Sequence, residues 1–199
     1  MATNEGLQKK IMIAIAAIIV VLGGLYFAGG TKQSTQPSQT TSASGQEEFA
    51  RGRALSKEKK FKEALEMYVA AADKGNLNGM NYAGMYLCNG YGGIQKDVSK
   101  GIGYLTKAAD AGLSAAQVNL GRAYMNPMYG LKADREKGLR YMTMAAEKNN
   151  SAAMLYLGYY YEAGMGVTKD KEKALEWYAK SEKLGNKAAK KRADNLKNQ

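Results

Sequence analysis

Residues 153–180 read AMLYLGYYYEAGMGVTKDKEKALEWYAK, and the spacing within this stretch decides the fold. Ala153 and Leu157 stand four residues apart, as side chains on one face of a helix do. Gly164 breaks this helical pattern, and Asp170 follows at a place suited to cap the N-terminus of a second helix. The stretch therefore predicts two helices joined by a short loop.

The two predicted helices carry small residues on their inward stripes. Ala174 and Tyr178 form the inward stripe of the second helix, and Gly185 follows its end, where glycine is the commonest residue. Gly158 in the first helix and Ala174 in the second have no side chain larger than a methyl group. We therefore expect the backbones of the two helices to approach closely.

The same pattern recurs along the chain with a period of 37 residues. Glycines in the first helices recur after 37 and 37 residues, and aspartates after 37 and 36. Because each aspartate precedes a second helix, the aspartates are expected to cap helices rather than to supply catalytic carboxylates. The recurring residues are Gly84, Gly121 and Gly158, together with Asp97, Asp134 and Asp170.

The pattern A-x-x-x-L-G-x-x-Y-x-x-G-x-G-V-x-x-D-x-x-K-A-x-x-W-Y-x-K, which residues 153–180 spell in full, resembles a Sel1-like repeat. The first unit has a shorter connection and resembles a tetratricopeptide repeat. This resemblance implies an all-α fold, a right-handed α-solenoid of helix hairpins that binds other proteins. The units would be about 47–78, 79–115, 116–151 and 152–187, followed by a C-terminal capping helix, within a repeat domain at 47–199.

An apolar segment precedes the repeats. Residues 11–27 are seventeen consecutive residues without a charge, and extending the run to 11–30 gives about 30 Å of helix, the thickness of a bilayer core. Lys9 and Lys10 stand directly before it. By the positive-inside rule, this predicts a cytoplasmic tail at 1–10, one transmembrane signal-anchor helix, and a repeat domain outside the cytoplasm.

A cleaved signal peptide is the alternative interpretation of this segment. The small residues at 28–30 could be cleaved, but the apolar run is longer than the usual signal-peptide core of about 7–15 residues. Tyr26 and Phe27 at its exit are typical of interfacial anchors.

A polar segment follows the apolar one. In residues 31–46, twelve of sixteen residues are Ser, Thr or Gln, which predicts a flexible linker.

The composition excludes most catalytic chemistries. The chain has no His and a single Cys, Cys88, so it lacks an imidazole base, an imidazole metal ligand and a disulfide within the chain. Cys88 is interpreted as a small apolar residue, with an intermolecular bridge as the alternative.

The net charge of +11 would suggest that the chain binds nucleic acid. The predicted orientation, with the repeats outside the cytoplasm, excludes nucleic acid as a partner. The basic residues near the C-terminus are interpreted as the solvated surface of the capping helix.

The side of each first helix that points away from the buried stripe is expected to bind a partner. A helix turns by about 100° per residue, so the angle from Gly158, or from Gly84 and Gly121 in the earlier units, assigns residues to this side. Their Tyr, Met, Leu and Val content, with one Arg, is typical of protein interfaces. The predicted partner-binding groove comprises Tyr82, Met85, Cys88, Val118, Asn119, Arg122, Met125, Leu155, Tyr156, Tyr159 and Glu162.

Taken together, these features predict a non-enzymatic interaction module or scaffold in the inner membrane, whose repeats face the periplasm and bind a protein. No cofactor, metal, small-molecule substrate or nucleic acid is expected. The resemblance also allows an immunity protein that neutralises a secreted toxin such as a lipase effector, or a structural subunit of an envelope complex. An envelope enzyme would need a pair of inward carboxylates, and the groove supplies only Glu162.

Overall fold

The computed structural model describes residues 44–126 and 128–198, and all regular structure in these ranges is helical, as expected. The predicted tail at 1–10, the apolar segment at 11–30 and nearly all of the linker lie outside them. Of the helices within them, none combines the length and apolar character that crossing a bilayer requires. The α-helices are α2 (Gln46–Lys57), α3 (Phe61–Asp73), α4 (Leu77–Asn89), α5 (Val98–Asp110), α6 (Ser114–Met125), α7 (Arg135–Glu147), α8 (Ser151–Ala163), α9 (Lys171–Lys183) and α10 (Lys187–Lys197).

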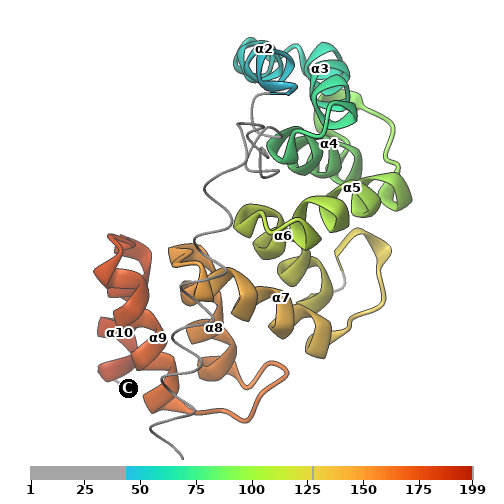
Figure 1. The fold of residues 1–199 in the computed structure, drawn as a ribbon. Helices are drawn as coiled ribbons and strands as arrows, with labels where there is room; N and C mark the ends of the chain where they lie inside the picture. Colours follow the sequence, from blue (N-terminus) through green and yellow to red (C-terminus); the bar gives the residue numbers. More distant parts are fainter. Residues whose placement is uncertain (1–43, 127, 199) are drawn as a thin grey trace, which may run out of the picture. The chain divides into compact units, whose positions relative to one another are not determined.

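The helices form four hairpins and one final helix. α2 packs with α3, α4 with α5, α6 with α7, and α8 with α9, while α10 packs against α9. The second helix of each hairpin also packs against the first helix of the next one. The hairpins follow one another along a single array from α2 to α10 (Figure 1). Each first helix after α2 is therefore covered on two sides, by α-helices before and after it in the chain.

The loop of each later hairpin is fixed at its end by an aspartate. In α5, α7 and α9, the aspartate carboxylate accepts the backbone N–H three residues ahead at 2.9–3.0 Å, which confirms the predicted N-caps. The bond from the Lys173 N–H lowers the pKa of Asp170. The backbone N–H of each aspartate also donates to a carbonyl of the preceding helix. These pairs are Asp97 with Leu87, Asp134 with Tyr124, and Asp170 with Tyr161.

The paired helices approach closely at the recurring glycines. A Cβ atom on Gly158 would lie 2.5 Å from the ring of Tyr178 and 3.1 Å from the carbonyl oxygen of Ala174. Such a distance to the ring is too short for real atoms, so the α8–α9 contact requires glycine at this position. The equivalent contacts are Gly52 with Ala64 and Tyr68, Gly84 with Gly101 and Leu105, and Gly121 with Gly138 and Met142.

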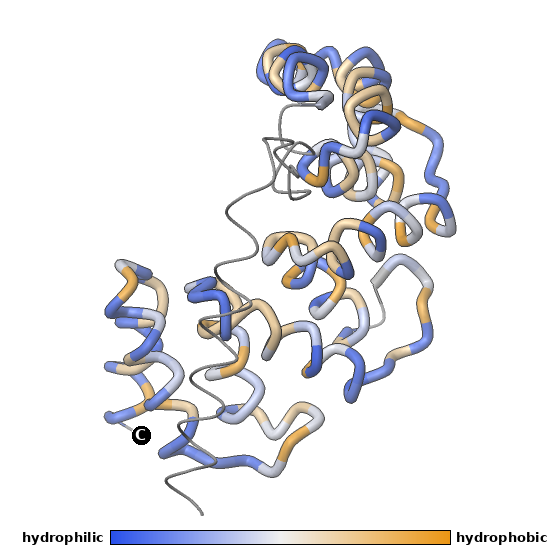
Figure 2. The backbone as a smooth tube through the Cα atoms, in the orientation of Figure 1, coloured by the Kyte–Doolittle hydropathy of each residue, from blue (hydrophilic) through white to orange (hydrophobic). Residues whose placement is uncertain are grey.

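Residues in the left-handed backbone conformation lie between successive hairpins. Gly185 has φ +85° just after α9, as predicted for a residue beyond a helix C-terminus. Asn149 takes the equivalent place after α7 with φ +58°, because asparagine tolerates this conformation better than most residues. The core consists of apolar clusters along the array, and Tyr68 and Tyr178 are fully buried within them. Figure 2 shows hydrophilic residues along much of α10, the helix that ends the described array.

Candidate functional site

Three residues of the predicted groove are buried in the core. Cys88 is 0 %, Val118 8 % and Met125 2 % exposed, so the prediction that they line a partner-binding groove is wrong. Cys88 and Met125 stand four residues after a recurring glycine, which places them only about 40° from it around the helix. They therefore face the second helix of their own hairpin, against Gly101 and Gly138.

Cys88 is a core residue, in agreement with its interpretation as a small apolar residue. Burial, and secondly the charge of Asp97, raise the pKa of the Cys88 thiol to about 11. A thiol that is fully buried and protonated at neutral pH cannot form a bridge to another chain while the hairpin stays folded. Its role is to fill the space left by Gly101.

Six other residues of the predicted groove remain partly accessible on α4, α6 and α8. They occupy two rows, about 160° and 100° around each helix from the recurring glycine, where neither neighbouring helix covers them completely. All six are half-buried. We call these rows the first-helix face, which comprises Tyr82, Met85, Asn119, Arg122, Tyr156 and Tyr159.

Contacts between neighbouring helices hold the first-helix face in place. The Asn119 amide nitrogen donates to the amide oxygen of Asn81 at 2.9 Å and so joins α6 to α4. The Arg122 guanidinium lies 5.3 Å from the ring centre of Tyr156 and joins α6 to α8 through a cation–π contact. The face is therefore formed by side chains that contact one another from one helix to the next.

The final helix α10 extends this face, which the sequence analysis missed. Arg192 stands 36 residues after Tyr156 and occupies the equivalent position on α10. Its guanidinium lies 4.7 Å from the ring centre of Tyr159, and one nitrogen donates to both carboxylate oxygens of Glu162 at 3.2 and 3.4 Å. The repeat period itself was the signal that could have placed α10 as the first helix of a fifth unit.

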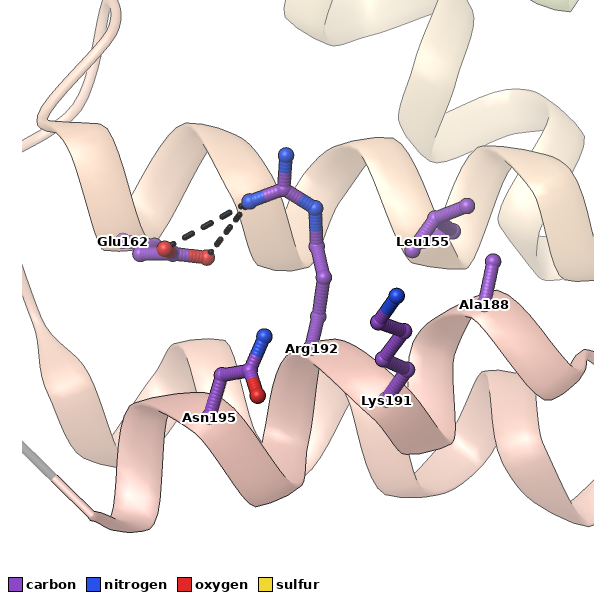
Figure 3. A pocket seen from close by; sticks show the side chains of 6 residues that line it. All are labelled: Leu155, Glu162, Ala188, Lys191, Arg192 and Asn195. Atoms are coloured by element: carbon purple, nitrogen blue, oxygen red, sulfur yellow. Dashed lines mark hydrogen bonds and ion pairs between the residues drawn. The ribbon is translucent and has the colours of Figure 1, made fainter.

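A pocket of about 500 Å³ lies between α8 and α10. Figure 3 shows Glu162 on one side of the Arg192 side chain, with Lys191 and Leu155 on the other. The hydroxyl of Tyr178 also donates to Glu162, and burial together with this bond raises the pKa of Tyr178. The pocket is lined by Leu155, Glu162, Ala188, Lys191, Arg192 and Asn195.

These surfaces combine aromatic, amide and charged side chains. Within residues 44–126 and 128–198, no three Cys, Asp or Glu side chains are grouped so as to hold a metal ion. Leu155 and Glu162, two further residues of the predicted groove, lie in the pocket, where the Glu162 carboxylate is engaged by Arg192 and Tyr178. Aromatic rings, methionine, amides and a held guanidinium are groups that recognise a peptide surface.

Several solved structures share this fold. A protective antigen of uropathogenic Escherichia coli strains, with an SLR fold, matches 75% of this chain and 32% of its own, at 24% identity and a TM-score of 0.66. A Sel1 repeat protein from Oxalobacter formigenes matches 71% of this chain and 56% of its own, at 27% identity and a TM-score of 0.62. The chain thus spans about a third of the first protein's length and just over half of the second's.

An immunity protein from Pseudomonas aeruginosa is also similar, over 73% of this chain and 67% of its own. The identity is 22% and the TM-score is 0.41. No curated protein matches the chain in sequence.

The Sel1 repeat family matches the chain at four consecutive segments. They are residues 48–76, 78–113, 114–150 and 151–186, which follow the four helix hairpins. Together they cover more than half of the sequence. The chain therefore belongs to the Sel1 repeat family.

Proposed function

We propose that the chain is a non-enzymatic interaction module that binds a protein partner on the first-helix face, outside the cytoplasm, while the segment at 11–30 anchors it in the inner membrane. Sel1 repeats are generally protein-interaction folds, which supports the first part. The observation that carries the proposal is the composition of the face. Three successive first helices present three tyrosines and a methionine, and Arg122 is the one charged residue among the six.

The dimensions of the face suit a peptide segment. Packed helices lie about 8–10 Å apart, so rows on three neighbouring first helices separated by second helices extend over at least about 20 Å. An extended segment of about six residues has this length, and so does a helix of about four turns. Aromatic anchors with a single Arg would bind apolar side chains next to an acidic group.

Truncating this face is expected to weaken binding without unfolding the chain. Arg122→Ala and Tyr156→Ala should each raise the Kd for a captured partner by more than about fivefold, since losses above about 1 kcal/mol mark interface hot spots. Glu176→Ala, an exposed change on α9, is the matched control. The partner is isolated with the full chain and affinities are measured by calorimetry. Normal binding by both variants, with loss in Glu176→Ala, would place the partner elsewhere.

The identity of the captured protein separates the possible roles. A secreted toxin neutralised by the chain would make it an immunity protein. A component of a stable envelope complex would make it a structural subunit. A regulated enzyme or receptor would make it a scaffold.

The anchor has its own test. A reporter that is active only outside the cytoplasm should work when fused after Gln199 and fail when fused ahead of Lys9, because the basic residues keep the N-terminus inside. The full chain should also stay with the membrane fraction after a high-salt wash. Recovery of a shorter, soluble chain beginning near Thr31 would show instead that the apolar segment is a cleaved signal peptide.

A further inference from the structure

The pocket between α8 and α10 continues the first-helix face. Lys191 and Arg192 occupy on α10 the positions that Leu155 and Tyr156 occupy on α8, 36 residues earlier. The Arg192 guanidinium makes a cation–π contact with Tyr159, which belongs to the face. A segment that lies across α4, α6 and α8 therefore meets this pocket next.

The pocket carries an excess of positive charge. Glu162 balances Arg192, whereas Lys191 makes no ion pair with any residue in the part of the chain that the structure describes. The rest of α10 adds to this field, because Lys187, Lys190 and Lys197 are opposed on the helix by Asp194 alone. Lys190 is engaged outside the pocket by Glu182 at 3.3 Å. A ligand with a negative charge is thus favoured at Lys191.

Arg192 is held in place by its neighbours although its side chain is 45 % exposed. One of its nitrogens donates to Glu162, and its central carbon lies over the ring of Tyr159. Glu162 is fixed in turn by the hydroxyl of the buried Tyr178. A guanidinium has five N–H donors, so donors remain after the bonds to Glu162 are made. Because its orientation is already set, little side-chain entropy remains to be lost on binding.

The remaining walls are apolar. Leu155 and Ala188 line the same pocket, and Figure 3 shows the Lys191 side chain between Arg192 and these two residues. We propose that this pocket receives an Asp or Glu side chain of the partner peptide, flanked by an apolar residue that packs on Leu155. This inference rests on the proposed function, since it names the part of the partner that the end of the first-helix face selects.

Two blocked peptides test the proposal on the full chain. One is acetyl-Ala-Leu-Glu-Leu-Ala-amide, and the other carries Gln in place of Glu, so the two differ only by the charge. The Glu peptide is expected to bind at least tenfold more tightly, as measured by NMR titration. Lys191→Gln should abolish this preference. Lys197→Gln, which removes the same charge from the exposed C-terminal end of the same helix, should preserve it.

Several results would overturn the proposal. They are equal binding of both peptides, binding of neither, or equal losses in the Lys191→Gln and Lys197→Gln variants, which would indicate unspecific attraction. Vesicles containing anionic lipid serve as a further probe. If they bind the chain, lose affinity equally in both variants and compete with the peptides, the charge of α10 serves a membrane surface and the pocket does not recognise peptides.

The partner assay separates this proposal from the proposed function. If Arg122→Ala weakens partner binding and Lys191→Gln does not, the pocket proposal fails and the interaction face stands. If both weaken it, both proposals are supported. If neither does, the proposed face is wrong and the pocket proposal fails with it.

Discussion

Replacing Gly158 by leucine is expected to lower the free energy of unfolding by about 3 kcal/mol, the upper range for overpacking a core. The new Cβ atom would lie 2.5 Å from the Tyr178 ring, which is fully buried between α8 and α9. A shift of the ring would disturb the hydrogen bond from its hydroxyl to Glu162. Urea unfolding followed by circular dichroism measures the change.

Gly103→Leu is the matched control for this prediction. Gly103 lies in the middle of α5 and is exposed. A Cβ atom at this position would have none of the described neighbouring atoms within 4 Å. Removing a glycine from a helix interior should therefore raise stability by about 0.5–1 kcal/mol. The two variants carry the same substitution with opposite expected signs. A loss of less than about 0.5 kcal/mol in Gly158→Leu would contradict the close α8–α9 approach.

Truncating Tyr178 to alanine is expected to cost about 3–5 kcal/mol, as for other large aromatic residues in cores. Its ring fills the space beside Gly158, and its hydroxyl holds Glu162, so the change leaves a cavity and frees the carboxylate that orients Arg192. The melting temperature and the urea midpoint should both fall.

Tyr178→Phe separates the two parts of this effect. It keeps the ring and removes only the hydroxyl, so the loss should be about 1.5–3 kcal/mol, the usual range for a hydrogen bond to a charged group. It should also weaken the preference of the pocket for the Glu peptide, because Glu162 and Arg192 become less fixed. If Tyr178→Ala and Tyr178→Phe cost the same, the ring is not the main contribution.

The helix hairpins could be predicted because their determinants are local and repeat. A glycine, a capping aspartate and an apolar stripe at helical spacing each act within one unit, and three copies make the period unmistakable. Asp97 and Gly185 illustrate this, since each was assigned a backbone role from its neighbours alone and has that role in the structure.

The accessible surface could be predicted only in part, because it depends on two neighbouring helices at once. α6 packs against its partner α7 and also against α5 of the preceding unit. These two contacts cover most of the helix, and Val118 is buried because it lies only about 60° around the helix from Gly121. On α8, which packs in the same way against α7 and α9, Tyr156 and Tyr159 stay partly accessible.

The ion pair at the end of the array could not be read from composition. Glu162 and Arg192 are thirty residues apart, and their contact requires α10 to pack as the first helix of another unit. A run of basic residues is typical of a solvated helix, and most of α10 is exposed. Only the alignment of α10 with α8 through the 36-residue period reveals that Arg192 continues the first-helix face.

The packing of each helix mainly against the next one along the chain has a consequence for how the protein forms. Contacts between sequence neighbours require only short loops to close, and chains with such low contact order fold quickly. Each hairpin can acquire its contacts as soon as its second helix leaves the ribosome, without waiting for distant segments. If the chain were pulled from one end, the hairpins would unfold one at a time, and the hairpins not yet unfolded would keep their structure.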